Sequence, residues 1–176
     1  ESSMSINLNL GSPNLMNPLI VMSVGGATVN ATTDLSSFTS TQIAALSNTQ
    51  VGALTSTQVR AISTGALEGL SNSQVQALST RNVAALTTEQ VAALSTKQLN
   101  ALKSAQINAM TAAQIDALTS DQLPGLRATQ ISSISTLRLG SVSSDQIAAF
   151  STAQIQALST DQMMALISDQ IAALGN

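Results

Sequence analysis

The stretch that decides the fold is Thr-Thr-Glu-Gln-Val-Ala-Ala-Leu, residues 87–94, because the same eight-residue pattern recurs on both sides of it. In general form the unit reads Leu-(Ser/Thr)-x-x-Gln-(Val/Ile)-x-Ala, and it runs without insertion through residues 38–176. A unit this short buries its apolar side only by stacking on neighbouring units. We therefore expect two parts: an N-terminal segment, residues 1–37, and an octapeptide-repeat array, residues 38–176.

Three apolar positions recur in every unit. The first is large and lies at every eighth residue from Phe38 to Leu174, and the second is aliphatic or Met and runs from Ile43 to Ile171. The third, from Ala45 to Ala173, holds only Ala, Gly or Ser. We expect the large and the small positions together to form the core.

The polar positions predict where helices begin. Ser or Thr usually follows the large residue, and Gln usually stands three places later. This is the pattern of a capping box, in which the hydroxyl and the Gln side chain each bond the backbone N–H of the other residue. Thr55, for example, is expected to cap a helix from Ser56 to Ile62, with Ser63 starting the next. This capping role accounts for the spacing of the Gln column without a ligand.

Two other folds fit the repeat less well. In one continuous helix, at about 100° per residue, a stripe repeating every eighth residue would spiral around the axis and face no single partner. In a β-solenoid, Val, Ile and Thr would be favourable, but Ala and Gln at fixed places and the lack of strict alternation are not. We predict an all-α repeat solenoid of short capped helices with an extended N-terminal segment, held by packing between units.

The N-terminal segment predicts strands. Residues 5–10 alternate polar and apolar, and residues 19–24 form a second apolar run that Gly25-Gly26 ends. Two strands alone make no stable sheet in water, so they either cap the chain's own array or pair with the next subunit. For the second case the candidate assembly residues are Ile6, Leu8, Leu10, Leu19, Ile20, Val21 and Val24, with Leu174 at the other end of the array.

Composition excludes several classes of function. The 176 residues are 44% apolar and 9% charged, with a net charge of −3 and neither His nor Cys. Catalysis by a Ser or Thr nucleophile lacks a visible base. The scattered basic residues do not suit a nucleic-acid groove. No apolar run reaches the ~18 residues of a membrane span. Asp145, Asp161 and Asp169 recur at one position but suit solvated helix N-termini better than a calcium row. We expect no enzyme, no catalytic or metal site and no cofactor.

The array resembles the Leu-Thr-x-x-Gln-Val-x-Ala octapeptide arrays of bacterial secreted and cell-surface proteins, and residues 87–95 are its clearest copy. That resemblance implies an extracellular or cell-surface location and a structural or adhesive role. The same octapeptide sequence also resembles the first helix of the repeats of TAL effectors, which bind DNA. The second helix, the base-reading residues and the basic charge of those repeats are missing here, so the likeness is not followed.

We therefore expect a structural subunit of an extracellular bacterial filament or fibre, whose partners are copies of itself. The array has few charges to keep monomers apart, and open head-to-tail contacts generate helical polymers. The alternative is a non-catalytic binding or adhesion module, or a stalk fragment of a larger surface adhesin. Its variable positions would then face a surface glycan or a host or partner protein.

Overall fold

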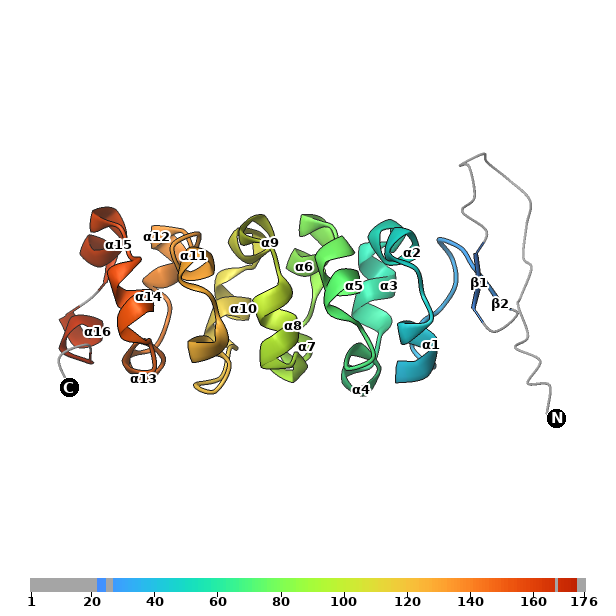
Figure 1. Cartoon of the computed structure of the whole chain (residues 1–176), viewed down its shortest axis with the longest axis horizontal. Coiled ribbons are helices and arrows are strands. Elements are labelled where there is room, and N and C mark those ends of the chain that lie inside the picture. Colours follow the sequence, from blue (N-terminus) through green and yellow to red (C-terminus); the bar gives the residue numbers. More distant parts are fainter. Residues whose placement is uncertain (1–21, 25–26, 167, 174–176) are drawn as a thin grey trace.

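The chain forms a coil of short helices that follows a small β-hairpin (Figure 1). The computed structural model describes residues 22–24, 27–166 and 168–173. The strands are β1 (Met22–Val24) and β2 (Ala27–Val29). The helices are α1 (Ser40–Ala44), α2 (Asn48–Ala53), α3 (Ser56–Ala61), α4 (Thr64–Leu67), α5 (Asn72–Ala77), α6 (Thr80–Ala85), α7 (Thr88–Ala93), α8 (Thr96–Ala101), α9 (Ser104–Ala109), α10 (Ala112–Asp116), the 3-10 turn η1 (Leu123–Gly125), α11 (Ala128–Ile131), α12 (Thr136–Leu139), α13 (Ser144–Ala148), α14 (Thr152–Gln156), α15 (Thr160–Ala165) and α16 (Ser168–Ala173).

The predicted capping boxes start the helices. At α7, Thr87 is extended (φ −74°, ψ 164°). Its hydroxyl accepts from the Gln90 N–H at 3.1 Å, and its own N–H donates to Gln90 Oε1 at 2.8 Å. The helix expected after Thr55 is α3, which ends at Ala61, one residue earlier than predicted. Each box satisfies two N–H groups that the first turn of a helix leaves unbonded.

The large apolar residue of each unit ends the helix and turns the chain. Leu94, for instance, follows α7 with extended dihedrals (φ −63°, ψ 133°), and its N–H donates to the Val91 carbonyl at 3.2 Å. A helix of six residues or fewer is marginal by itself in water. The stability of the coil must therefore come from contacts between units.

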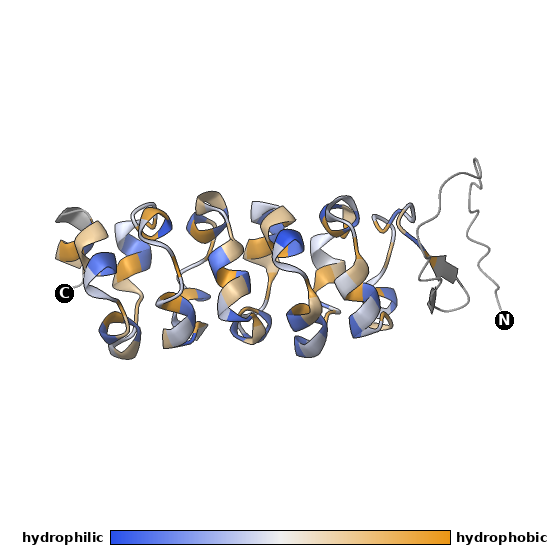
Figure 2. Cartoon of the chain, turned by 90° about the horizontal axis from the view of Figure 1, so that it is seen from above, coloured by the Kyte–Doolittle hydropathy of each residue, from blue (hydrophilic) through white to orange (hydrophobic). Residues whose placement is uncertain are grey.

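Those contacts connect each helix to the third helix along the chain, as in α2 with α5 and α6 with α9 (Figure 1). Both large positions point into the coil. The first, from Phe38 to Leu166, is at most 9% exposed, and the second, from Ile43 to Ile147, is at most 1% exposed. Every helix in Figure 2 carries both hydrophobic and hydrophilic residues, as one buried and one exposed side require. The predicted repeat solenoid is confirmed.

The small position lies mostly at the edge of the core, with Ala77 packed against it, which corrects the prediction that it forms the core together with the large positions. Among its described members only Ala85 is buried, and the others are half-buried or exposed. They are small because successive turns approach closely there. A Cβ on Gly69 would lie 2.1 Å from the carbonyl oxygen of Ser40, and one on Gly125 would lie 1.8 Å from Thr96 Cγ2.

Residues before the first helix pack on the coil. Val29, Leu35 and Phe38 belong to the same apolar cluster as the array, and Leu35 is fully buried. β1 lies within the predicted 19–24 strand and stops before Gly25-Gly26, but its antiparallel partner is β2, which the sequence pattern did not indicate. The other predicted strand, residues 5–10, lies outside the described residues. Among the helices that are described, none is long and apolar enough to cross a lipid bilayer.

Candidate functional site

The most regular polar feature of the coil is a row of buried Gln side chains, which we call the glutamine ladder. Each member bonds, through its Nε2, backbone carbonyls 28, 30 or 31 residues earlier; Gln106, for example, donates to Leu78 at 2.8 Å and to Val75 at 2.9 Å. Those carbonyls lie at and just beyond the C-terminal end of a helix in the preceding turn. The ladder consists of Gln74, Gln90, Gln98, Gln106, Gln114, Gln122, Gln130, Gln146, Gln154, Gln162 and Gln170.

The ladder gives each Gln two roles. Its Oε1 accepts from the backbone N–H of the N-cap residue of its own helix. Its Nε2 donates to backbone carbonyls at the C-terminal end of an earlier helix. The same side chain therefore satisfies orphan groups at both kinds of helix end. The sequence analysis found only the first role. The signal for the second was that Gln never gives way to Glu at this position. Glu serves a capping box equally well but cannot donate.

Three units interrupt the ladder. Asn82, with a shorter side chain, donates only to Leu54, at 2.7 Å. Ala66 has no side-chain donor. Arg138 turns outward and bonds the backbone carbonyl and the side chain of Asn108. The ladder is therefore continuous from Gln90 to Gln130, in the middle of the array.

The N-terminal end of the coil is partly closed by its own chain. Gln58 Nε2 donates to the carbonyls of Asn30 at 2.6 Å and Thr33 at 3.1 Å, so the loop before α1 takes the place of an earlier turn. The Nε2 groups of Gln42 and Gln50 have no such acceptor among the described residues. Gln42 is half-buried, whereas every ladder member is buried.

The other end of the described coil leaves an apolar row uncovered. The second large position is fully buried at Ile147, half-buried at Ile155 and Met163, and 50% exposed at Ile171. These last three residues lie on α14, α15 and α16, which pack on α11, α12 and α13 of the turn before them. The aliphatic position is thus the one that the following turn normally covers.

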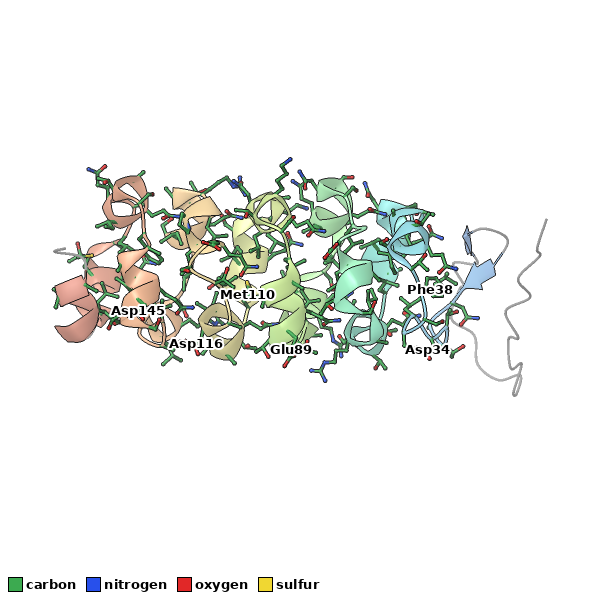
Figure 3. The ribbon with its side chains drawn as sticks, turned by 90° about the horizontal axis from the view of Figure 1, so that it is seen from below. Asp34, Phe38, Glu89, Met110, Asp116 and Asp145 are labelled. Carbon is green, nitrogen blue, oxygen red and sulfur yellow. The ribbon has the colours of Figure 1, made fainter. Side chains whose placement is uncertain are left out.

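The charged residues lie at the variable positions on the outside of the coil. Figure 3 shows Glu89 and Asp116 at its periphery and Met110 inside. The backbone N–H of Glu89 and the Thr87 hydroxyl hold the pKa of Glu89 below its ordinary value. The Ser36 N–H does the same for the pKa of Asp34. Both carboxyls are in solvent, so these shifts reflect local hydrogen bonds.

Among the described residues, there is no cluster of three or more His, Cys, Asp or Glu that would suit a metal ion. A shallow hollow of about 390 Å³ lies between the loop 31–34 and α3, and Thr hydroxyls and Gln58 line it. In the described part of the chain, every buried side-chain N or O atom already has a hydrogen-bond partner.

A coil of similar short units, most of them capped and bonded to the preceding turn by one Gln side chain, defines the class of helical-repeat solenoids. The chain belongs to the ALTTAQ repeat family, which matches residues 31–64, 59–96, 91–128 and 140–176. Residues 85–90 of this chain read Ala-Leu-Thr-Thr-Glu-Gln, one letter from the family's name. No curated protein matches the chain in the comparison with known sequences.

The predicted assembly residues are largely beyond the described part of the structure. Val24 is the last residue of β1. The others lie outside the described residues: Ile6, Leu8, Leu10, Leu19, Ile20, Val21 and Leu174. Their role in assembly stays a prediction.

Proposed function

We propose that the chain is a non-catalytic structural subunit of an extracellular bacterial filament or fibre, which assembles end to end. The observation that carries this proposal is the contact between successive turns. One side of a turn offers amide donors, and the other offers carbonyls and an aliphatic row. Most turns have these same two unlike sides, so the last turn of one copy offers a surface of the kind that the next turn normally covers. Head-to-tail stacking of this kind produces an open helical polymer when the rotation between copies does not close a ring.

Composition supports the same function. Only 9% of the residues are charged and the net charge is −3, so electrostatic repulsion between copies is weak. The sequence lacks His and Cys, which removes the commonest general base and the thiolate nucleophile. The extracellular location rests on the resemblance to secreted and cell-surface repeat arrays.

A binding or adhesion module is the second candidate, and two exposed apolar side chains favour it. Leu137 is 84% exposed and Met164 is 71% exposed, and both lie at variable positions of their units. Isolated exposed apolar residues are common on protein surfaces, so this observation is weaker than the turn-to-turn contact.

The deciding experiment is negative-stain electron microscopy of the purified chain at low micromolar concentration, with size-exclusion chromatography and light scattering on the same sample. We expect uniform fibres and a concentration-dependent loss of monomer. A monomer at every concentration would contradict the filament role and leave the binding module as the better account. Labelling of intact cells that make the protein, using an antibody against it, tests the location. Signal only after lysis would refute an extracellular site.

A further inference from the structure

The two ends of the described coil are unlike, and each lacks what the other offers. At α14–α16, the aliphatic row of Ile155, Met163 and Ile171 becomes progressively exposed, whereas the equivalent Ile43 at α1 is fully buried. The carbonyls of Phe150, Leu158 and Leu166 receive no Gln amide among the described residues. In the middle of the array, the equivalent carbonyls of other units accept from Gln side chains of the ladder at 2.7–2.9 Å, as the Leu86 carbonyl does from Gln114.

The first turn presents the matching donors. Gln42 and Gln50 use Oε1 and the backbone N–H for their own capping boxes, at the start of α1 and α2. Their Nε2 groups have no acceptor among the described residues, although the equivalent group of Gln74 bonds three carbonyls of the preceding turn. The two amides are one repeat apart along the chain, as are the carbonyls of Leu158 and Leu166.

We propose that the α1–α2 edge of one copy docks on the α14–α16 edge of a second copy, so that the glutamine ladder continues across the joint. This inference rests on the proposed filament function and names its interface. Gln42 and Gln50 donate to backbone carbonyls of the partner's last turn, and the partner's Met163 and Ile171 become covered. The occupant is a second copy because the contact would repeat, at α1 and α2, the one that each chain already makes between its own turns, while Gln58 of α3 stays bonded to the loop before α1.

Burial of the exposed aliphatic row supplies the attraction, and the amides set the register. Apolar surface that leaves water stabilises the joint without directional preference. Carbonyls that become buried without a donor carry a desolvation cost, so a shifted or inverted docking is disfavoured. The joint therefore admits one polarity, with all subunits pointing the same way along the fibre.

The donor side is tested by the double variant Gln42→Glu, Gln50→Glu. A carboxylate keeps the acceptor that the capping box needs, but it removes the N–H groups and places negative charge against carbonyls. The control is Thr41→Glu, Thr49→Glu, which adds the same charge one residue earlier at exposed positions. Glu89 already occupies the corresponding position in α7. We expect the test variant to raise the critical concentration for polymerisation by about tenfold or more, and the control to match the unaltered chain.

The apolar side is tested by Met163→Lys against Met164→Lys. The two residues are adjacent in α15, and Met163 is half-buried while Met164 is 71% exposed. Only Met163→Lys should block fibres, and both variants should keep the far-UV circular dichroism of the parent chain. Cross-linking gives a readout that a loss of folding cannot mimic. The chain has no Cys, so a mixture of Ala45→Cys and Thr160→Cys chains should form a disulfide-linked dimer under oxidation, beyond what either forms alone, because the joint would place these two positions as Gly125 and Thr96 lie within one chain.

The outcomes separate this inference from the filament function. Fibres that persist in both test variants, with no cross-link between the mixed chains, would overturn the joint while leaving the filament function standing. If the unaltered chain forms no fibres and the mixed chains no cross-link, both proposals fall.

Discussion

A change of Gln114 to Glu tests the glutamine ladder most sharply, because it alters one of the two roles of this side chain. Gln114 Nε2 donates to the carbonyls of Val83 at 2.9 Å and Leu86 at 2.7 Å, and its Oε1 accepts from the Thr111 N–H at 2.8 Å. The side chain is 2% exposed. Gln114→Glu keeps the acceptor and the shape but removes both donors.

The expected cost follows from three contributions. Two hydrogen bonds are lost, at about 1 kcal/mol each, and two buried carbonyls lose their donor. A carboxylate is also buried beside those carbonyls, so it either stays charged at a further cost or takes up a proton. We expect destabilisation of about 3–5 kcal/mol at pH 7. The matched control is Gln42→Glu, where Nε2 has no acceptor among the described residues. Its cost to the monomer should stay below about 0.5 kcal/mol.

The pH dependence has a definite sign. Burial beside carbonyls raises the pKa of the introduced carboxyl above its unfolded value of about 4.3. The protonated form is therefore favoured in the folded chain. The variant loses stability as the pH rises from the unfolded pKa of this carboxyl to its raised pKa in the folded chain. We expect Gln114→Glu to be less destabilised at pH 4 than at pH 7.

The assay is urea denaturation followed by far-UV circular dichroism, under conditions where the chain is monomeric. Repeat arrays can unfold in parts, so the curves are fitted with a nearest-neighbour description of the units rather than as two states. Equal costs for Gln114→Glu and Gln42→Glu would refute the ladder, because they would reduce the Gln column to its capping role.

Other substitutions test the approach of the turns, the ladder break and the pH response. Gly69→Ala should destabilise the coil by about 1–3 kcal/mol in the same assay, because its Cβ would overlap a backbone carbonyl of α1. Gly65→Ala, with nothing within 4 Å, should be neutral or stabilising, and equal losses would contradict the packing argument. Arg138→Gln should exchange the exposed bonds of Arg138 to Asn108 for buried ladder bonds and stabilise the coil by about 1 kcal/mol; an unchanged urea midpoint would show that the exchange gains nothing. The pKa values of Asp34 and Glu89 are lowered, so their contribution is present above the ordinary values and lost as pH falls through the lowered ones. With no His in the chain, the melting temperature should be flat near neutrality and fall only in acid; a step near pH 6.5 would contradict this.

The sequence predicted the fold class because the information lies in the period. An octad excludes one straight helix, and the Ser/Thr-x-x-Gln pattern places a helix start in every unit, as at Thr55 and Thr87. Local spacing cannot reveal which units become neighbours in space. That helices three units apart pack together follows from the angle at residues such as Leu94, which no pattern encodes.

The same limit explains the two main points at which the structure differs from the sequence-based prediction. The small position looked like core because Ala and Gly are apolar, yet their size serves the close approach of the turns, as at Gly69. The Gln column looked complete as a cap because the acceptors of its Nε2 are 28–31 residues away. Only the absence of Glu from that column hinted that a donor was needed.

The most direct test of the central claim is a cryo-electron microscopy reconstruction of the assembled chain. The account predicts a polar fibre in which α1–α2 of each copy sits on α14–α16 of the next, with the coil and its ladder continuous across the joint. A chain that stays monomeric, or a fibre in which copies pack side by side with these two edges apart, would contradict it.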